Sequence, residues 1–336
     1  DNQPDNQPCA GLRGETLRSC QNFVGSSTNN FGENQKNYID QINLTLAPLQ
    51  SAENNLQQSI NLQRTLINKL TELKLCQTNR GVSGKEATVA ELETEQKKID
   101  QMTADLGSLQ NASVPLLNAK LHIENLPSGN VYDLNAAFNE IRKLLNPIKA
   151  NEAESIAKKE LSDTQTRIAL EDEITALVKN NNFDGIDIDF EAKKHETITY
   201  FSTFLKGLYQ RMGNKWVYCT VEARMPLEDR FSPGATIPPD ATDFANDYVE
   251  MNKYCDRVEV MAYDQGTINV RLNAARFAPY APVADPGWVE NVVTLAAQSV
   301  SRNKLIIGVP TYGYEYAVTS LGSGGYQYKV LWPFNY

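Results

Sequence analysis

The sequence predicts an α/β protein in which a helical hairpin precedes a parallel sheet with helical crossovers. Between residues 35 and 126, leucine and isoleucine recur at heptad spacing, which is typical of helices that pack along one seam. After residue 180, short apolar runs alternate with amphipathic helical segments. Strand–helix alternation of this kind forms parallel sheets, because each crossover helix returns the chain to the same edge.

The hairpin is predicted from two apolar stripes and the break between them. The stripes consist of Ile42, Leu49, Leu56, Leu66, Leu70 and Leu73, followed by Leu92, Ile99, Met102, Leu106, Leu109 and Leu116. Residues 79–84 have the composition of a turn, and Pro115 is expected to end the second helix. This hairpin or coiled coil is either a stalk, spacer or self-association element, or a helical subdomain packed on the rest of the chain.

The segments around the hairpin complete the predicted domain order. Residues 1–34 form a polar N-terminal segment that opens with the repeat DNQPDNQP, and residues 127–160 form a helical connector. The sheet region covers residues 161–336, with the start of an insertion at about 318–336. Its strands are predicted at 183–191, 215–223, 257–264 and 304–310, and its helices at 196–212, 241–254 and 288–302.

The charge and hydropathy of the chain limit which partners it can bind and whether it can cross a membrane. The net charge of −9 and the scattered lysines and arginines argue against a nucleic-acid partner. No apolar run approaches the roughly 20 residues of a membrane span. The chain begins at Asp1 without a visible signal peptide, so we expect a processed or trimmed N-terminus.

The cysteines and histidines are too few for a metal centre or a disulfide scaffold. Five cysteines and two histidines occur without a Cys-x-x-Cys pair, which makes a zinc site improbable; we expect neither a metal nor a cofactor. Cys9 and Cys20 are candidates for a short disulfide loop in an exported protein. Cys219 and Cys255 could form a disulfide or remain free buried thiols, and the sequence does not decide between these alternatives.

Acidic side chains alternate along the predicted strand 183–191. Asp187, Asp189 and Glu191 would share one face, about 6.5–7 Å apart, because strand side chains alternate with period two. Such a row of carboxylates is costly to desolvate, and it is expected where one carboxyl must stay protonated to act as a general acid. The alternatives are a solvent-facing edge strand or a metal site of paired aspartates.

Three motifs resemble those of family 18 glycoside hydrolases, the chitinase-like enzymes, over about residues 161–316. Asp184-x-x-Asp187-x-Asp189-x-Glu191 is similar to the family's acidic signature. Met261-Ala262-Tyr263-Asp264 resembles its Met-x-Tyr-Asp at the end of the sixth barrel strand, and residues 304–314 resemble the seventh strand and its loop. The resemblance implies a (β/α)₈ TIM-type barrel with its site at the C-terminal ends of the strands.

The resemblance also implies a substrate-assisted retaining mechanism and a role for each motif residue. Glu191 would protonate the glycosidic oxygen, and the substrate's 2-acetamido group would be the nucleophile. Asp189 would hold the acetamido N–H, while Asp187 would share a proton with it. Tyr263 would bind the acetamido oxygen, with Asp264 beside it.

Further residues are expected around this site. Met261 belongs to the Met-x-Tyr-Asp motif, and Arg224 and Tyr312 should lie near C-terminal strand ends, where they are candidate sugar contacts. Asp184 and Gly185 are interpreted as structural, since they shape the entry into the strand.

The chain departs from the family pattern on both sides of the readable strands. The sequence shows four of eight strands, without the Ser-x-Gly-Gly motif of the third strand or the tryptophan of the eighth. Trp332 is a possible sugar-stacking residue, although a core or interface position is favoured. Three explanations account for the missing strands: residues absent from this sequence, completion of the barrel by another chain, or structural reuse of a degenerate barrel.

These observations predict an exported glycosidase, secreted or at the cell surface, that cleaves β-1,4-linked N-acetylhexosamine polymers of the chitin or peptidoglycan type. The alternative is a non-catalytic chitinase-like protein that binds carbohydrate or builds a surface filament.

Overall fold

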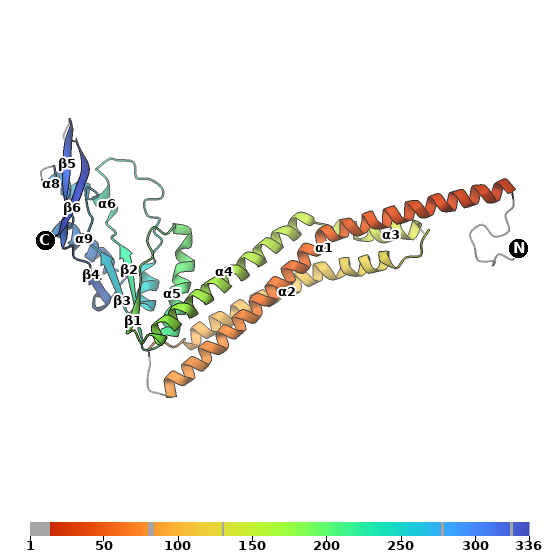
Figure 1. Cartoon of the computed structure of the whole chain (residues 1–336), viewed down its shortest axis with the longest axis horizontal. Helices are drawn as coiled ribbons and strands as arrows, with labels where there is room; N and C mark the ends of the chain where they lie inside the picture. The colour runs from red at the N-terminus through yellow and green to blue at the C-terminus, as the bar shows by residue number, and fades with distance from the viewer. Residues whose placement is uncertain (1–13, 80–83, 130, 277–278, 323–324, 336) are drawn as a thin grey trace. The chain divides into compact units, whose positions relative to one another are not determined.

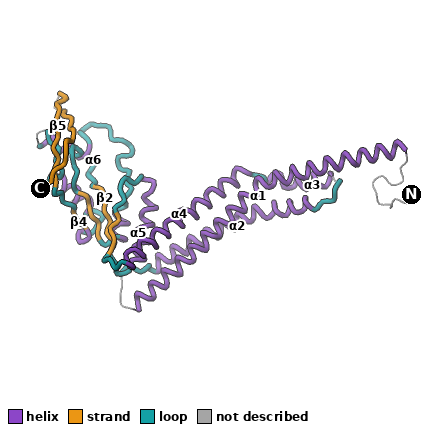
Figure 2. Tube along the Cα trace, in the orientation of Figure 1, coloured by secondary structure: helices purple, strands orange, loops and turns teal. Residues whose placement is uncertain are grey.

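The computed structural model describes residues 14–79, 84–129, 131–276, 279–322 and 325–335. The chain divides into two compact units, one of residues 1–71 and 88–166 and the other of residues 72–87 and 167–336. Figure 2 shows that the strands are confined to the C-terminal part of the chain, after a helical N-terminal part. The α/β class and the helical N-terminal part are therefore confirmed, whereas coiled-coil geometry stays a prediction.

The helical part contains α1 (Gly14–Asn79), α2 (Val89–Glu124), α3 (Val131–Ile141), a 3₁₀ turn η1 (Arg142–Leu144) and α4 (Pro147–Asn180). Members of the predicted stripes lie in its core: Leu56 of α1 packs with Ile99, Met102 and Leu106 of α2, and Ile60, which was not predicted, joins them. A capping box begins α2, since the Thr88 hydroxyl accepts from the Glu91 N–H while the Glu91 carboxylate accepts from the Thr88 N–H.

The helices extend beyond their predicted ends. The first helix begins at Gly14 rather than near residue 35, and Phe31 joins the core with a 3% exposed side chain. Pro115 lies inside α2 instead of ending it. A proline inside a helix costs about 3 kcal/mol, but Leu116 and Ile123 beyond it are fully buried, and their burial offsets this cost.

The second unit is built on four parallel strands in the order β1-β2-β3-β4 (Figure 1). They are β1 (Gly185–Ile188), β2 (Trp216–Glu222), β3 (Arg257–Met261) and β4 (Leu305–Ile307). The crossovers contain α5 (Ile198–Met212), α7 (Tyr248–Tyr254) and α9 (Pro286–Ala296), with the short elements η2 (His195–Thr197), α6 (Leu227–Arg230), α8 (Val270–Ala275) and η3 (Arg302–Lys304).

One face of this sheet carries the core. Ile188, Val217, Cys219, Val258 and Val260 are buried, and they pack against apolar side chains of α5, α7 and α9. Residues between them point to the opposite face because side chains alternate across a strand. This apolar face is thus the helix-covered face, and its packing holds the strands in place.

Several predicted elements of this unit are longer than the observed ones. The first strand ends at Ile188, so Asp189 and Glu191 follow the strand rather than belong to it. The helix predicted at 241–254 begins only at Tyr248, because the Asp247 carboxylate caps its first turn. The carbonyl groups of Ala241 and Asn246 accept hydrogen bonds from Arg230 and Arg224, which holds the preceding segment in a loop.

A disulfide and a hairpin complete the unit. Cys219 of β2 is bonded to Cys255 behind α7, which settles the open question of their state, whereas the side chains of Cys9 and Cys20 lie outside the described residues. The strands β5 (Tyr312–Gly322) and β6 (Gly325–Asn335) form an antiparallel pair. Trp332 is 63% exposed on β6, so it does not lie in the core of this unit, and its Nε1 donates to Glu315.

Among the described residues, no helix combines the length and apolar character that crossing a membrane requires.

A buried carboxylate joins α4 to α5. Glu171 has no exposed surface, and its oxygens lie 2.6 Å from Arg167 Nη1 and 2.5 Å from Arg211 Nη1. Burial raises the pKa of Glu171, although both arginines act in the opposite direction. The carboxylate fits only because Gly207 has no side chain: a Cβ there would lie within 3.0 Å of three Glu171 atoms.

We therefore expect Gly207→Ala to lower the free energy of unfolding of this unit by about 1–3 kcal/mol, as overpacking does in other cores. Tryptophan fluorescence during urea unfolding measures this unit, because all three tryptophans lie in it. The matched control is Gly107→Ala in α2, where a Cβ would meet no atom within 4 Å. The control should leave the fluorescence transition unchanged, and an unchanged transition in Gly207→Ala would contradict the packing argument.

Candidate active site

The motif residues gather at the C-terminal ends of the parallel strands. Asp187 is in β1, and Asp189 and Glu191 follow it; Glu222 ends β2, and Tyr263 and Asp264 follow β3. Parallel strands bring their carboxyl ends to one edge of a sheet, and this edge is the usual place for a site in α/β folds.

Asp187 is fixed by its neighbour on β2. The Thr220 hydroxyl lies 2.9 Å from both carboxylate oxygens of Asp187 and donates to them. The strands pair in parallel with Asp187 opposite Tyr218. Thr220 is two residues after Tyr218, so its side chain lies on the same face of the sheet as Asp187. This bond orients the carboxylate toward the open face of the sheet.

Asp189 and Glu191 are exposed and lie beside a lysine. The ammonium of Lys193 donates to the Phe190 carbonyl and lies 4.6 Å from the centre of the Phe201 ring. Burial lowers the pKa of Lys193, while the carboxylates of Glu222, Asp189 and Glu191 raise it. A positive charge therefore stands among the carboxylates of the predicted site.

Tyr263 is half-buried against a glycine. A Cβ on Gly308, behind β4, would lie 2.6 Å from Tyr263 Cε1, so only glycine leaves room for the ring in this position. Burial raises the pKa of Tyr263, and the carboxylates of Glu259, Asp189 and Glu191 act in the same direction. The phenol consequently stays protonated and can donate a hydrogen bond near the carboxylates of the β1 end.

Asp264 receives two phenol groups. Its Oδ1 accepts from Tyr312 at 2.7 Å and from Tyr314 at 3.0 Å, and its backbone has φ +56°. The Tyr312 ring also contacts the Tyr263 ring edge-on, with centroids 6.4 Å apart. Asp264 thereby ties the start of the β5–β6 hairpin to the end of β3.

Arg224 and Met261, which were also predicted near the site, contact other residues of the protein. The Arg224 guanidinium lies between the rings of Phe244 and Tyr248, 4.0 and 4.1 Å from their centres, and donates to the Asn246 carbonyl. It is thus engaged in a stack, and its role as a sugar contact stays a prediction. Met261 ends β3, where it is half-buried opposite Glu222.

Asp184 and Gly185 lie at the entry of β1. The Asp184 carbonyl accepts from the Trp216 N–H at 2.9 Å, which starts the β1–β2 ladder. A Cβ on Gly185 would lie within 3.0 Å of the Trp216 backbone, so the close approach of these strands requires glycine.

Sequence reasoning missed Thr220, Glu222, Asn246, Tyr314 and Gly308. One available signal was the alternation Tyr218-x-Thr220-x-Glu222 in β2, which places polar side chains on the face that carries Asp187. Gly308 and Tyr314 lie within residues 304–314, whose resemblance to the seventh strand and its loop was a second signal, whereas Asn246 is positioned by tertiary contacts in a loop.

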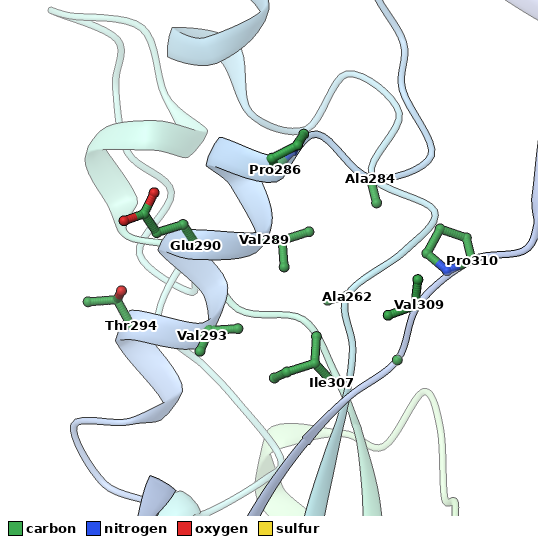
Figure 3. Close-up of a pocket in the computed structure, with 11 residues that line it drawn as sticks. Ala262, Ala284, Pro286, Val289, Glu290, Val293, Thr294, Ile307, Val309 and Pro310 are labelled. Carbon is green, nitrogen blue, oxygen red and sulfur yellow. The ribbon is translucent and has the colours of Figure 1, made fainter.

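A separate apolar hollow lies beside α9 and β4 (Figure 3). Val289 and Val293 of α9 face Ile307 and Val309, with Ala262 between them. It contains none of the predicted catalytic residues, so it is distinct from the carboxylate cluster. Within the described ranges, no three His, Cys, Asp or Glu side chains are grouped to hold a metal ion.

A family model and a curated relative match the C-terminal part of the chain. Residues 152–331 match the family model described as glycosyl hydrolases family 18. An uncharacterized glycosylase, YvbX of Bacillus subtilis, is 26% identical over 163 residues, which are 48% of this chain and 43% of that protein. The chain thus spans less than half the length of this curated relative.

Two solved structures that resemble this chain also match only about half of it. The putative sporulation-specific glycosylase ydhD of Bacillus subtilis is 24% identical, with a TM-score of 0.37 and coverage of 49% of both chains. A chitinase of Chromobacterium violaceum is 21% identical, with a TM-score of 0.37 and coverage of 46% of this chain and 44% of that one.

The phenol groups at Asp264 give a test of this geometry. Burial and then the hydrogen bond to Asp264 raise the pKa of Tyr312, and the hydrogen bond raises that of Tyr314. Asp264→Asn removes the negative acceptor, so both tyrosines should ionise at lower pH, closer to the ordinary value of about 10. NMR titration of ring-labelled tyrosine measures this, with Tyr200 of α5 as the internal reference; unmoved titrations of Tyr312 and Tyr314 would contradict the bonds.

Proposed function

The chain belongs to glycosyl hydrolase family 18, and from this premise we propose that it is a glycosidase that cleaves β-1,4-linked N-acetylhexosamine polymers. Its four parallel strands would be part of a (β/α)₈ barrel. The observation that carries the proposal is the meeting of Asp187, Asp189 and Glu191 with the Tyr263–Asp264 pair at one edge of the sheet. These are the groups that substrate-assisted hydrolysis requires.

In the proposed first step, Glu191 gives its proton to the glycosidic oxygen as the bond from that oxygen to C1 breaks. The carbonyl oxygen of the 2-acetamido group forms a new bond to C1, giving an oxazolinium-type intermediate. In the second step, ionised Glu191 removes a proton from water, and the water oxygen bonds to C1 as the bond from the acetamido oxygen to C1 breaks, which restores the acetamido group with overall retention.

The other residues orient the acetamido group. Asp189 accepts its N–H and stabilises the positive charge of the intermediate, with Asp187 held behind it by Thr220. Tyr263 donates to the acetamido oxygen, which its raised pKa supports because the phenol keeps its proton. The mechanism needs a 2-acetamido group at the cleavage position, so cellulose and starch are not substrates.

We also propose that the protein works in an exported location, secreted or at the cell surface. The Cys219–Cys255 disulfide supports this location, since disulfides persist in oxidising compartments and are rare in the cytosol.

The decisive experiment measures turnover of N-acetylglucosamine oligosaccharides and of peptidoglycan by the full-length protein. Glu191→Gln should lower kcat by about 10²–10⁴-fold, because the amide cannot supply the proton. Glu196→Gln, an exposed carboxylate five residues later, is the matched control and should retain wild-type kcat. Proton NMR of the first product should show the β-anomer, and cello-oligosaccharides should not be cleaved.

Two outcomes would contradict this proposal. Equal turnover by wild type and Glu191→Gln would remove Glu191 from its role. Binding of the oligosaccharide without turnover by wild type would favour a non-catalytic carbohydrate-binding protein.

A further inference from the structure

Glu222 at the end of β2 is bonded on both carboxylate oxygens. Its Oε1 accepts from the backbone N–H of Ala192 at 3.2 Å, and its Oε2 accepts from Asn246 Nδ2 at 2.8 Å. Ala192 directly follows Glu191 in the chain. A side chain on one strand thus holds the backbone beside the proposed acid on the neighbouring segment.

The backbone at Ala192 needs such support. Its φ is +52°, a left-handed conformation that costs a residue with a side chain about 1–2 kcal/mol relative to a right-handed one. Such a conformation persists only where surrounding bonds over-determine it. The hydrogen bond from Ala192 to Glu222 is one of these bonds, and it fixes the direction in which the chain leaves Glu191.

A second layer holds Glu222 itself. Asn246 is 6% exposed, and its carbonyl accepts from Arg224, whose guanidinium is stacked between Phe244 and Tyr248. The stacked arginine therefore locks the segment that carries Asn246. His195 Nδ1 also lies 2.9 Å from the Phe244 carbonyl, which joins the two segments a second time.

We propose that Glu222 is a positioning residue for Glu191, which acts by holding the Ala192 backbone and is itself held by Asn246 and Arg224. This inference rests on the proposed function, because it assigns the network to proton transfer by Glu191. A general acid must lie within about 0.5 Å of its productive position, so a loosened backbone lowers kcat more than it raises KM.

The test uses two substitutions at Glu222 in the full-length protein, with an N-acetylglucosamine oligosaccharide as substrate. Glu222→Ala removes both bonds and should lower kcat at least about tenfold, with KM within about twofold of wild type. Glu222→Gln should restore most of kcat, because its amide oxygen still accepts from Ala192. Asn246 Oδ1 has no partner among the described residues, so its amide can turn to accept from the new Gln Nε2.

Glu228→Ala is the control, since Glu228 is an exposed carboxylate six residues further along the same connection. It should leave kcat unchanged. An unaffected kcat in Glu222→Ala would overturn the inference, and so would a Gln variant as impaired as the Ala variant, because charge rather than hydrogen bonding would then matter.

Amide hydrogen exchange separates this inference from the proposed function, since it requires no turnover. Peptides that cover residues 189–196 should exchange faster in Glu222→Ala than in wild type and Glu228→Ala. Equal exchange would overturn the positioning role even in an active enzyme. If Glu222→Ala exchanges faster but the wild type shows no turnover, the hydrogen-bond network is supported and only the glycosidase proposal is contradicted.

Discussion

The parallel pairing of β1 with β2 is the constraint on which the site depends. The pairing is close because Gly185 presents no side chain to the Trp216 backbone, and it places Asp187 opposite Tyr218. From this register Thr220 reaches Asp187, and Glu222 at the end of the longer strand reaches Ala192 beyond β1. One glycine at the start of the strand therefore sets the geometry of carboxylates at its end.

The sequence was sufficient to predict the order of the strands but not their ends. Strands were predicted at 215–223, 257–264 and 304–310, and β2, β3 and β4 lie within these ranges. Alternating side chains along 183–191 led us to extend the first strand through Asp189 and Glu191, which is too far. The pattern of side chains does not indicate the backbone angle φ. Ala192 has a φ of +52°, and it lies after the last residue that pairs with β2.

The site was predictable where its residues are close in sequence and unpredictable where tertiary contacts decide. The acidic signature and Met261–Asp264 are local motifs, so their meeting follows from parallel strands. The stacking of Arg224 between Phe244 and Tyr248 joins residues about twenty positions apart through an irregular loop. An arginine near a strand end is a candidate ligand contact in sequence, but its stack on two rings and its hydrogen bond to the Asn246 carbonyl cannot be seen there.

The same unit uses carboxylates in two physically different ways. Glu171 is removed from water and lies between two arginines, in space that Gly207 leaves empty, so its charge serves packing and is inaccessible to a substrate. Asp189 and Glu191 are exposed at the strand ends, with the ammonium of Lys193 beside them. Burial raises the pKa of Glu171 and both arginines oppose this rise, and no solvent reaches the carboxylate to exchange a proton with it. Access to solvent therefore distinguishes the buried carboxylate of Glu171 from the exposed carboxylates of Asp189 and Glu191, and only the exposed pair can meet the substrate that we propose.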